Sequence, residues 1–207
     1  GINGNSAVFP GGADVYAAGE VPPSGTRFQN QTLALGADDY TIVMWVRATS
    51  AFGGNGLVWR DNGSGAFDLF LSKSGTIEYS VPGDGATMAS TVSSAIPVDS
   101  EWYHVAVVVN RDNLGDNPSA IYVNSCDVTE DPMEDTPSSL TPGASEFYLW
   151  GRALVGQGDD FAIFKQALSQ AQVASFAGLT TLISTTSSTT SGTSCNVKLP
   201  PTVMMLN

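Results

Sequence analysis

Short segments in which apolar side chains alternate face by face recur along this chain, separated by glycine- and proline-rich turns. The clearest is Tyr40–Ala48, where Ile42 and Met44 lie on one face of an extended chain and Val43 and Trp45 on the other, because successive strand residues point to opposite faces. Both faces are largely apolar. We therefore expect a strand whose second face is also covered by another element.

Further segments have the same character, and little helix separates them. Strands are expected at 7–9, as three strands within 56–81, and at 102–110, 120–125, 146–151 and 159–164. Residues 127–145 are expected to form a proline- and acid-rich loop. Strands that recur between turns are typical of an all-β, two-sheet antiparallel sandwich or jelly roll.

One helix is expected near the end of this pattern. Ser169 stands three residues before Gln172, which is the spacing of a capping box, and Leu168 and Val173 are placed for a hydrophobic staple. Gly178 provides the stop signal. The sequence therefore predicts a short C-terminal helix at the edge of a β fold.

The composition changes after residue 179. Residues 180–194 are rich in Ser and Thr, and the final residues 203–206 are apolar. We expect one domain over 1–179 and an extension over 180–207. A polar tract of this kind needs a surface on which to order. That surface is either its own domain or a neighbouring subunit.

Charge narrows the classes of partner. The chain has 20 acidic and 8 basic residues, for a net charge of −12. A polyanion such as nucleic acid would be repelled. The apolar runs are too short to span a bilayer, and no basic amphipathic helix provides a contact with anionic lipid. We expect neither nucleic acid binding nor membrane insertion.

Cys126 and Cys195 are the only cysteines. They fit either one disulfide in a secreted protein or two unrelated thiols in a cytosolic one. The disulfide is favoured, because Cys195 lies in a segment that otherwise lacks an anchor. Asn30 and Asn62 each begin an N-glycan acceptor triplet, which favours export as a glycoprotein.

The sequence offers little catalytic chemistry. Asp159 and Asp160 are consecutive at an expected strand start, so their side chains should diverge and cannot flank one scissile bond. The acidic run from Glu130 to Glu134 contains Pro132 and is expected to be a solvated loop. His104 is the only histidine, and we expect it to be a packed, hydrogen-bonded strand residue. The chain is predicted not to be an enzyme.

Candidate glycan contacts combine aromatic rings, which stack on sugars, with polar side chains that bind hydroxyl groups. Two such groups stand beside expected strands. The predicted contacts are Trp59, Arg60, Asp61 and Asn62 in the first group, and Tyr148, Trp150 and Arg152 in the second. The alternative for the tryptophans is a place in the core.

Four stretches of the sequence resemble one family. They are GNSAVFPGGADVY at 4–16, DDYTIVMWVRATS at 38–50, EWYHVAVVVNRDN with AIYVNS within 101–125, and FYLWG with GDDFAIFKQALSQAQV within 147–173. Together they resemble the laminin G-like, concanavalin A-like jelly rolls. The tail after 179 is not part of the resemblance.

The resemblance implies a two-sheet jelly roll, usually extracellular, that recognises glycans or proteins and in some members carries calcium at the sandwich edge. It would bring Asp14 near Asp159, where a structural calcium could bind; no other cofactor is expected. The alternative for Asp159 is a structural role, in which its carboxylate accepts hydrogen bonds from backbone N–H groups of a turn at the strand start.

These inferences lead to a non-catalytic extracellular module that binds a glycan or glycoprotein, within a larger assembly at a cell or virion surface. The alternative is a structural subunit of a filament, coat or virion surface, whose tail contacts copies of itself or other surface proteins. A polysaccharide hydrolase or lyase is the third reading.

Overall fold

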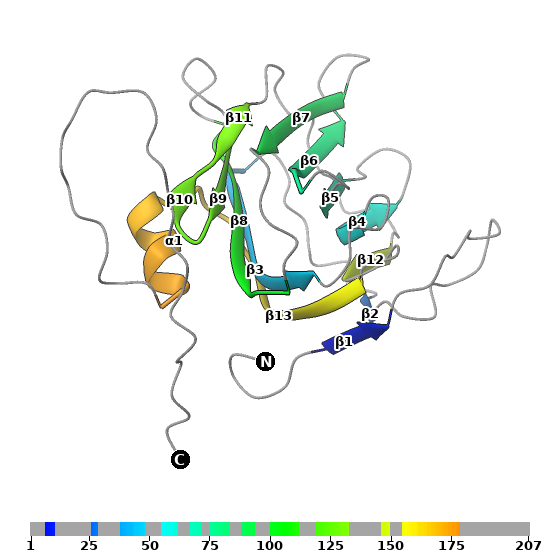
Figure 1. The fold of residues 1–207 in the computed structure, drawn as a ribbon. Helices are drawn as coiled ribbons and strands as arrows, with labels where there is room; N and C mark the ends of the chain where they lie inside the picture. The colour runs from blue at the N-terminus through cyan, green and yellow to red at the C-terminus, as the bar shows by residue number, and fades with distance from the viewer. Residues whose placement is uncertain are drawn as a thin grey trace.

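The computed structural model describes residues 7–10, 26–28, 38–48, 55–61, 67–71, 75–82, 88–93, 100–111, 119–132, 146–149 and 155–178. These residues form two antiparallel sheets and a short helix (Figure 1).

The six-stranded sheet has the strand order β1 (Ala7–Pro10), β13 (Val155–Phe164), β3 (Tyr40–Ala48), β8 (Tyr103–Val109), β9 (Ser119–Val123), β10 (Cys126–Asp127). The seven-stranded sheet has the order β11 (Thr129–Asp131), β7 (Met88–Ser93), β6 (Ile77–Pro82), β5 (Phe67–Leu71), β4 (Asn55–Asp61), β12 (Glu146–Leu149), β2 (Thr26–Phe28). The paired strands are antiparallel throughout, which confirms the predicted all-β, two-sheet architecture.

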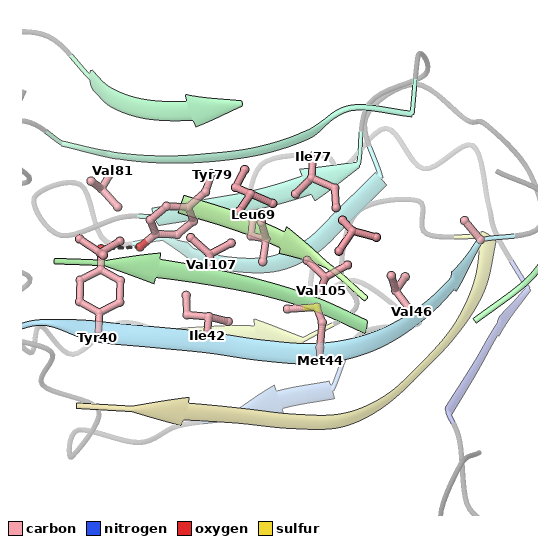
Figure 2. Close-up of a cluster of buried hydrophobic side chains, with 14 residues drawn as sticks. Tyr40, Ile42, Met44, Val46, Leu69, Ile77, Tyr79, Val81, Val105 and Val107 are labelled. Carbon is pink, nitrogen blue, oxygen red and sulfur yellow. Dashed lines mark hydrogen bonds between the residues drawn. The ribbon is translucent and has the colours of Figure 1, made fainter. Parts of the chain in front are cut away.

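The main core lies between the sheets and follows the predicted alternation. Figure 2 shows side chains of the six-stranded sheet meeting those of β5 and β6. The buried members are Tyr40, Ile42, Met44, Val46 and Ala48 of β3, Val105, Val107 and Val109 of β8, Ile121 and Val123 of β9, Leu69 of β5, and Ile77, Tyr79 and Val81 of β6. Burying these side chains is the main favourable term in forming the sandwich.

One polar contact crosses this core. The hydroxyl groups of Tyr40 and Tyr79 form a hydrogen bond of 2.8 Å between the sheets, and their rings meet edge to face (Figure 2). Burial raises the pKa of Tyr40 to about 12, because an ionised phenol would lose its hydration there. The two hydroxyl groups therefore satisfy each other in an otherwise apolar layer.

The outer face of the six-stranded sheet is covered by α1 (Gln170–Phe176), as the apolar second face of β3 predicted (Figure 1). Leu168 and Val173 pack there against Val43, Ala106 and Val108. The expected capping box is present, since the Ser169 side chain and Gln172 bond each other's backbone N–H groups. The helix ends before Gly178, whose φ of +70° suits glycine.

Two side chains fasten the helix segment to the sheet. Thr41 Oγ1 accepts a hydrogen bond from the Leu168 backbone N–H at 2.9 Å and donates one to the Gln166 carbonyl at 2.8 Å. Gln170 Nε2 donates to the Ser125 carbonyl at 2.8 Å, in the two-residue turn between β9 and β10. These contacts fix where α1 enters and which way it runs.

Two expectations are corrected. Residues 127–145 were expected to form a loop, but Cys126–Asp127 pairs with β9, and Thr129–Asp131, which contains Glu130, pairs with β7 as an edge strand. This segment passes from one sheet to the other just before Pro132, consistent with the confinement of proline to edges.

The second correction concerns Asp159 and Asp160. They do not begin a strand but lie inside β13, at a register shift between Asp159 and Ala162. Asp160 is a bulge residue with a φ of +47°, and its backbone N–H donates to Asp159 Oδ1 at 3.0 Å. The bulge gives β13 one more residue than β3 between the two paired positions Asp159 and Ala162. From Ala162 onward, the inward- and outward-facing positions of β13 again match those of β3.

Candidate ligand-binding face

The outer face of the seven-stranded sheet differs from the face under α1. On β6, the buried residues Ile77, Tyr79 and Val81 face the core, while Glu78 and Ser80 alternate with them and are half-buried. Within the part of the chain that the structure describes, no helix packs on this side. This alternation of buried and half-buried polar positions is the pattern of an antiparallel sheet that packs one face on the core.

The strand register aligns one row of positions across the seven-stranded sheet. Ser80 lies opposite Asp68 of β5, which lies opposite Trp59 of β4. Trp59 lies opposite Tyr148 of β12. The full row is Ser90, Ser80, Asp68, Trp59, Tyr148 and Arg27, from β7 to β2. With strands about 4.8 Å apart, these six positions span roughly 24 Å.

This row joins members of the two predicted glycan-contact groups. Trp59 and Tyr148 are far apart in the sequence but are direct register partners in adjacent strands, visible as β4 and β12 in Figure 1. Arg60 is the register partner of Phe147 and Phe67, so it lies in the neighbouring row. Asp61 lies opposite Glu146. The structure thus separates Arg60 from its two sequence neighbours.

The predicted contacts Asn62, Trp150 and Arg152 lie outside the described residues. Sequence reasoning missed Arg27, Asp68, Ser80 and Ser90 as members of the row. No local motif marks them, because the row exists only through the pairing of six strands.

His104 is packed, as predicted, but its ring is not hydrogen-bonded. The ring is fully buried on the outer face of the six-stranded sheet, edge to face with Trp45 at a centroid distance of 5.3 Å and 6.2 Å from the Phe176 ring. Neither ring nitrogen has a hydrogen-bond partner within the described structure. Burial lowers the pKa of His104 to about 4, so the imidazole is neutral at pH 7.

The predicted calcium site is only partly within the described chain. β1 pairs with β13, so the first strand and the strand carrying Asp159 are neighbours, as expected. The register runs from Ala7 opposite Gly158 to Pro10 opposite Val155, away from Asp159 as the chain approaches Asp14. Asp14 lies outside the described residues. Calcium binding by Asp14 and Asp159 stays a prediction.

A polar cluster that sequence reasoning missed lies beside Asp159. Arg47 Nη1 donates to Gln157 Oε1 at 3.0 Å, and Arg47 Nε donates to the Ser100 carbonyl. Ser100 has a φ of +68° and donates its N–H to the Ala48 carbonyl. The cluster fixes the loop before β8 against the end of β3.

The remaining predictions lie partly or wholly outside the described chain. Cys126 is buried at the start of β10, while Cys195, Asn30 and the extension 180–207 are not described. The disulfide pairing, the glycosylation sites and the domain division at 179 stay predictions. Among the described residues, no helix has the length and apolar character needed to cross a membrane.

Comparison with known families agrees with this architecture. A laminin G-type family model, described as the concanavalin A-like lectin/glucanases superfamily, matches residues 23–174. The chain belongs to this superfamily. The two sheets are therefore those of a concanavalin A-like jelly roll, as the sequence resemblance implied. No curated protein sequence matches the chain at a significant level.

Solved structures with the same fold include glycan-binding modules. A CBM40 module of the Ruminococcus gnavus IT-sialidase, bound to α2,3-sialyllactose, has a TM-score of 0.58 at 17% identity, covering 73% of this chain and 91% of the module. The heptameric SAP-like pentraxin of Limulus polyphemus has a TM-score of 0.56 at 15% identity, with coverages of 82% and 80%. Domain 4 of AbnA, an extracellular arabinanase from Geobacillus stearothermophilus, in complex with arabinotriose, has a TM-score of 0.51 at 18% identity, with coverages of 74% and 72%.

Proposed function

We propose that this chain is a non-catalytic glycan-binding module that acts outside the cell. Its binding face is the outer face of the seven-stranded sheet, centred on Trp59 and Tyr148. The observation that carries the proposal is the register pairing of these two residues, which brings two separately predicted contact groups into one row.

The chemistry of the row suits a sugar chain. Aromatic rings stack on the apolar faces of sugar rings, and Ser, Asp and Arg side chains bind hydroxyl groups. Because the row spans roughly 24 Å across the strands, it has room for several sugar units. The ligand we propose is therefore an oligosaccharide or the glycan of a glycoprotein.

The compared structures support a binding role. The sialidase CBM40 module and domain 4 of the arabinanase were solved with bound sugars, sialyllactose and arabinotriose. The module and this arabinanase domain have the fold of this chain at low sequence identity, so the likeness supports the class of ligand and not a particular sugar.

His104 and Asp159 are the best candidates for catalytic residues. Their surroundings also favour a binding role for the chain over a catalytic one. His104 is neutral and lies in an aromatic cluster under α1, and Asp159 accepts a hydrogen bond from its own neighbour at a strand bulge.

Export is supported by the cysteines. Cys126 and Cys195 are the only cysteines in the sequence, and we propose that they pair. A disulfide between them fits an oxidising, extracellular environment. Non-reducing peptide mapping checks this pairing: a peptide linking Cys126 to Cys195 is expected, and a free thiol at either position would contradict it.

A glycan array, with and without calcium, tests the binding function. We expect binding to at least one sugar class, and at least a tenfold loss of affinity in Trp59→Ala and in Tyr148→Ala, because a sugar–aromatic stack is removed. The matched control is Phe176→Ala, which removes an exposed aromatic ring from the other side of the sandwich. The comparison of the arrays with and without calcium tests whether the predicted ion contributes to binding.

Two outcomes would contradict the proposal. The first is an array without binding in either condition. The second is binding that is reduced by Phe176→Ala and unchanged by Trp59→Ala and Tyr148→Ala, which would move the ligand to the opposite face.

A further inference from the structure

The strongest unexplained feature of the described chain is the His104 ring. It is fully buried, and neither of its nitrogens has a hydrogen-bond partner among the described residues. Buried polar atoms are rarely left without a partner, because each one loses its hydration on folding. The glycan-binding proposal makes no use of this residue, which lies on the opposite outer face.

The walls around the ring are aromatic. Trp45 lies edge to face with His104 across the β3–β8 register, and the Phe176 ring of α1 lies 6.2 Å away. Phe176 also meets Phe164 edge to face at 5.2 Å. The main chain of His104 is fully committed, since its N–H donates to Asn124 Oδ1 and its carbonyl accepts from the Asn124 N–H. The strand is thus held in place, and only the side chain lacks polar contacts.

The charged groups on this face offer a protonated ring no direct partner. On β13, Asp159 lies in the same register row but on the far side of Trp45. On β3, Arg47 is two residues beyond Trp45 and is bonded to Gln157. Asn124, which directly follows β9, is neutral. Burial and the nearby Asp127 raise the pKa of half-buried Tyr122 on β9. The helix α1 contains no ionisable residue.

The cover over His104 is partly open to solvent. The Phe176 side chain is 42% exposed, the one large apolar side chain that is exposed in the described chain. The hydrogen bonds that hold the helix segment to the sheet lie at its start, at Leu168 and Gln170. Beyond them the helix is held by apolar packing of Val173 and by the ring contacts of Phe176.

We propose that α1 is an acid-released cover: protonation of His104 displaces the Phe176 end of the helix from the six-stranded sheet. An imidazolium cannot remain in an aromatic cluster without water or a counter-ion, and moving Phe176 admits water. The strands beneath stay paired, because the backbone contacts of His104 do not depend on its ring. Release separates the Phe176 ring from the rings of His104 and Phe164.

The pH range follows from linkage. Burial lowers the pKa of His104 from its ordinary value of 6.5 to about 4. The open state binds the proton more tightly, so acid favours opening. The open-to-closed ratio rises about tenfold for each pH unit below about 6.5 and levels off near pH 4, a total of roughly 300-fold.

Hydrogen exchange measured by NMR tests the release directly. The reporters are the Val173 and Ala177 amides, which donate to the Ser169 and Val173 carbonyls at 2.9 and 3.0 Å. We expect their protection factors to fall about tenfold per pH unit between pH 6 and pH 4 and to stay below those of core strands β3 and β8 at every pH. His104→Phe, which keeps every carboxylate, should remove this dependence.

The proposal is overturned if the protection factors of the α1 amides depend on pH in His104→Phe as they do in the wild type, because carboxylates would then be responsible. It is also overturned if the α1 amides are as strongly protected as the core amides of β3 and β8 throughout this range, because α1 would then open only by global unfolding.

A second measurement depends on the cover itself. His104 is the only histidine, so its ring protons give one assignable titration curve. Phe176→Ala should raise the His104 pKa toward 6.5 by admitting water, while the matched control Phe176→Leu, which keeps an apolar cover, should leave it near the wild-type value. An unchanged titration in Phe176→Ala would show that Phe176 is not the cover.

Discussion

The two sheets of the sandwich present outer faces of opposite character. The outer face of the six-stranded sheet carries Val43, Ala106 and Val108, and α1 covers it. The outer face of the seven-stranded sheet carries half-buried polar positions such as Glu78 and Ser80, and no described helix covers it. The comparison shows that the residues between the core positions decide which outer face of the sandwich receives the helix.

The largest difference should appear when each face loses side-chain atoms. Leu168→Ala removes a buried side chain that packs between α1 and the sheet, and we expect a loss of about 2–5 kcal/mol in the free energy of unfolding. Ser80→Ala, on the other face, should cost within about 0.5 kcal/mol. Urea denaturation measures both. Equal losses would show that the two faces do not differ in this way.

The second largest effect should be a loss of stability in acid, caused by His104 on the covered face. The pKa of His104 is about 4 in the folded protein against 6.5 ordinarily, so the unfolded chain binds the proton first as the pH falls. The stability due to the neutral ring is complete above pH 6.5 and is lost progressively down to pH 4, about 3 kcal/mol in total. Denaturant midpoints of wild type and His104→Phe across this range measure it. Parallel curves for the two proteins would contradict the assignment.

The contact between the sheets should have an intermediate effect. Tyr79→Phe removes the hydroxyl that bonds Tyr40 in the core, and we expect a loss of about 1–2 kcal/mol with unchanged topology. The control is Tyr122→Phe, at a half-buried position on the covered face. Thermal unfolding compares the two variants. An equal loss of stability at both positions would show that the hydrogen bond between the sheets contributes no more than the Tyr122 hydroxyl.

The smallest effect should come from the helix cap. Ser169→Ala removes the side chain that accepts from the Gln172 N–H, and we expect a loss of about 1 kcal/mol. Ser175→Ala changes an exposed serine within the same helix and should be nearly neutral. Since α1 covers only one sheet, neither variant should change glycan binding on the other. A loss of binding in Ser169→Ala would link the two faces.

Much of the fold could be predicted locally. The alternation in Tyr40–Ala48 identified β3 and its covered second face, and the spacing of Ser169 and Gln172 identified the start of α1. The bulge at Asp159 and Asp160 could not be predicted, because its signal is a register shift against β3 and not a local composition. The short strands β2, β7, β10 and β11 were also missed, since their stability comes from their neighbours.

The candidate site shows the same division. Trp59 and Tyr148 were identifiable as residue types that bind sugars, but their adjacency depends on β12 pairing with β4 after 80 or so intervening residues, a distance at which sequence patterns carry no register. Arg60 was predicted in the same group, but its register partner on β5 is Phe67, so it lies in the row next to that of Trp59.

By itself, the sequence determined which segments are extended, where the helix begins and which superfamily the chain belongs to, because period, capping and turn residues act over a few positions. Only the tertiary structure decided which residues share a face, that the His104 ring is enclosed without a polar partner, and that one row crosses six strands. These depend on pairing and packing between distant segments, whose energy is set by the whole sandwich and not by any one segment.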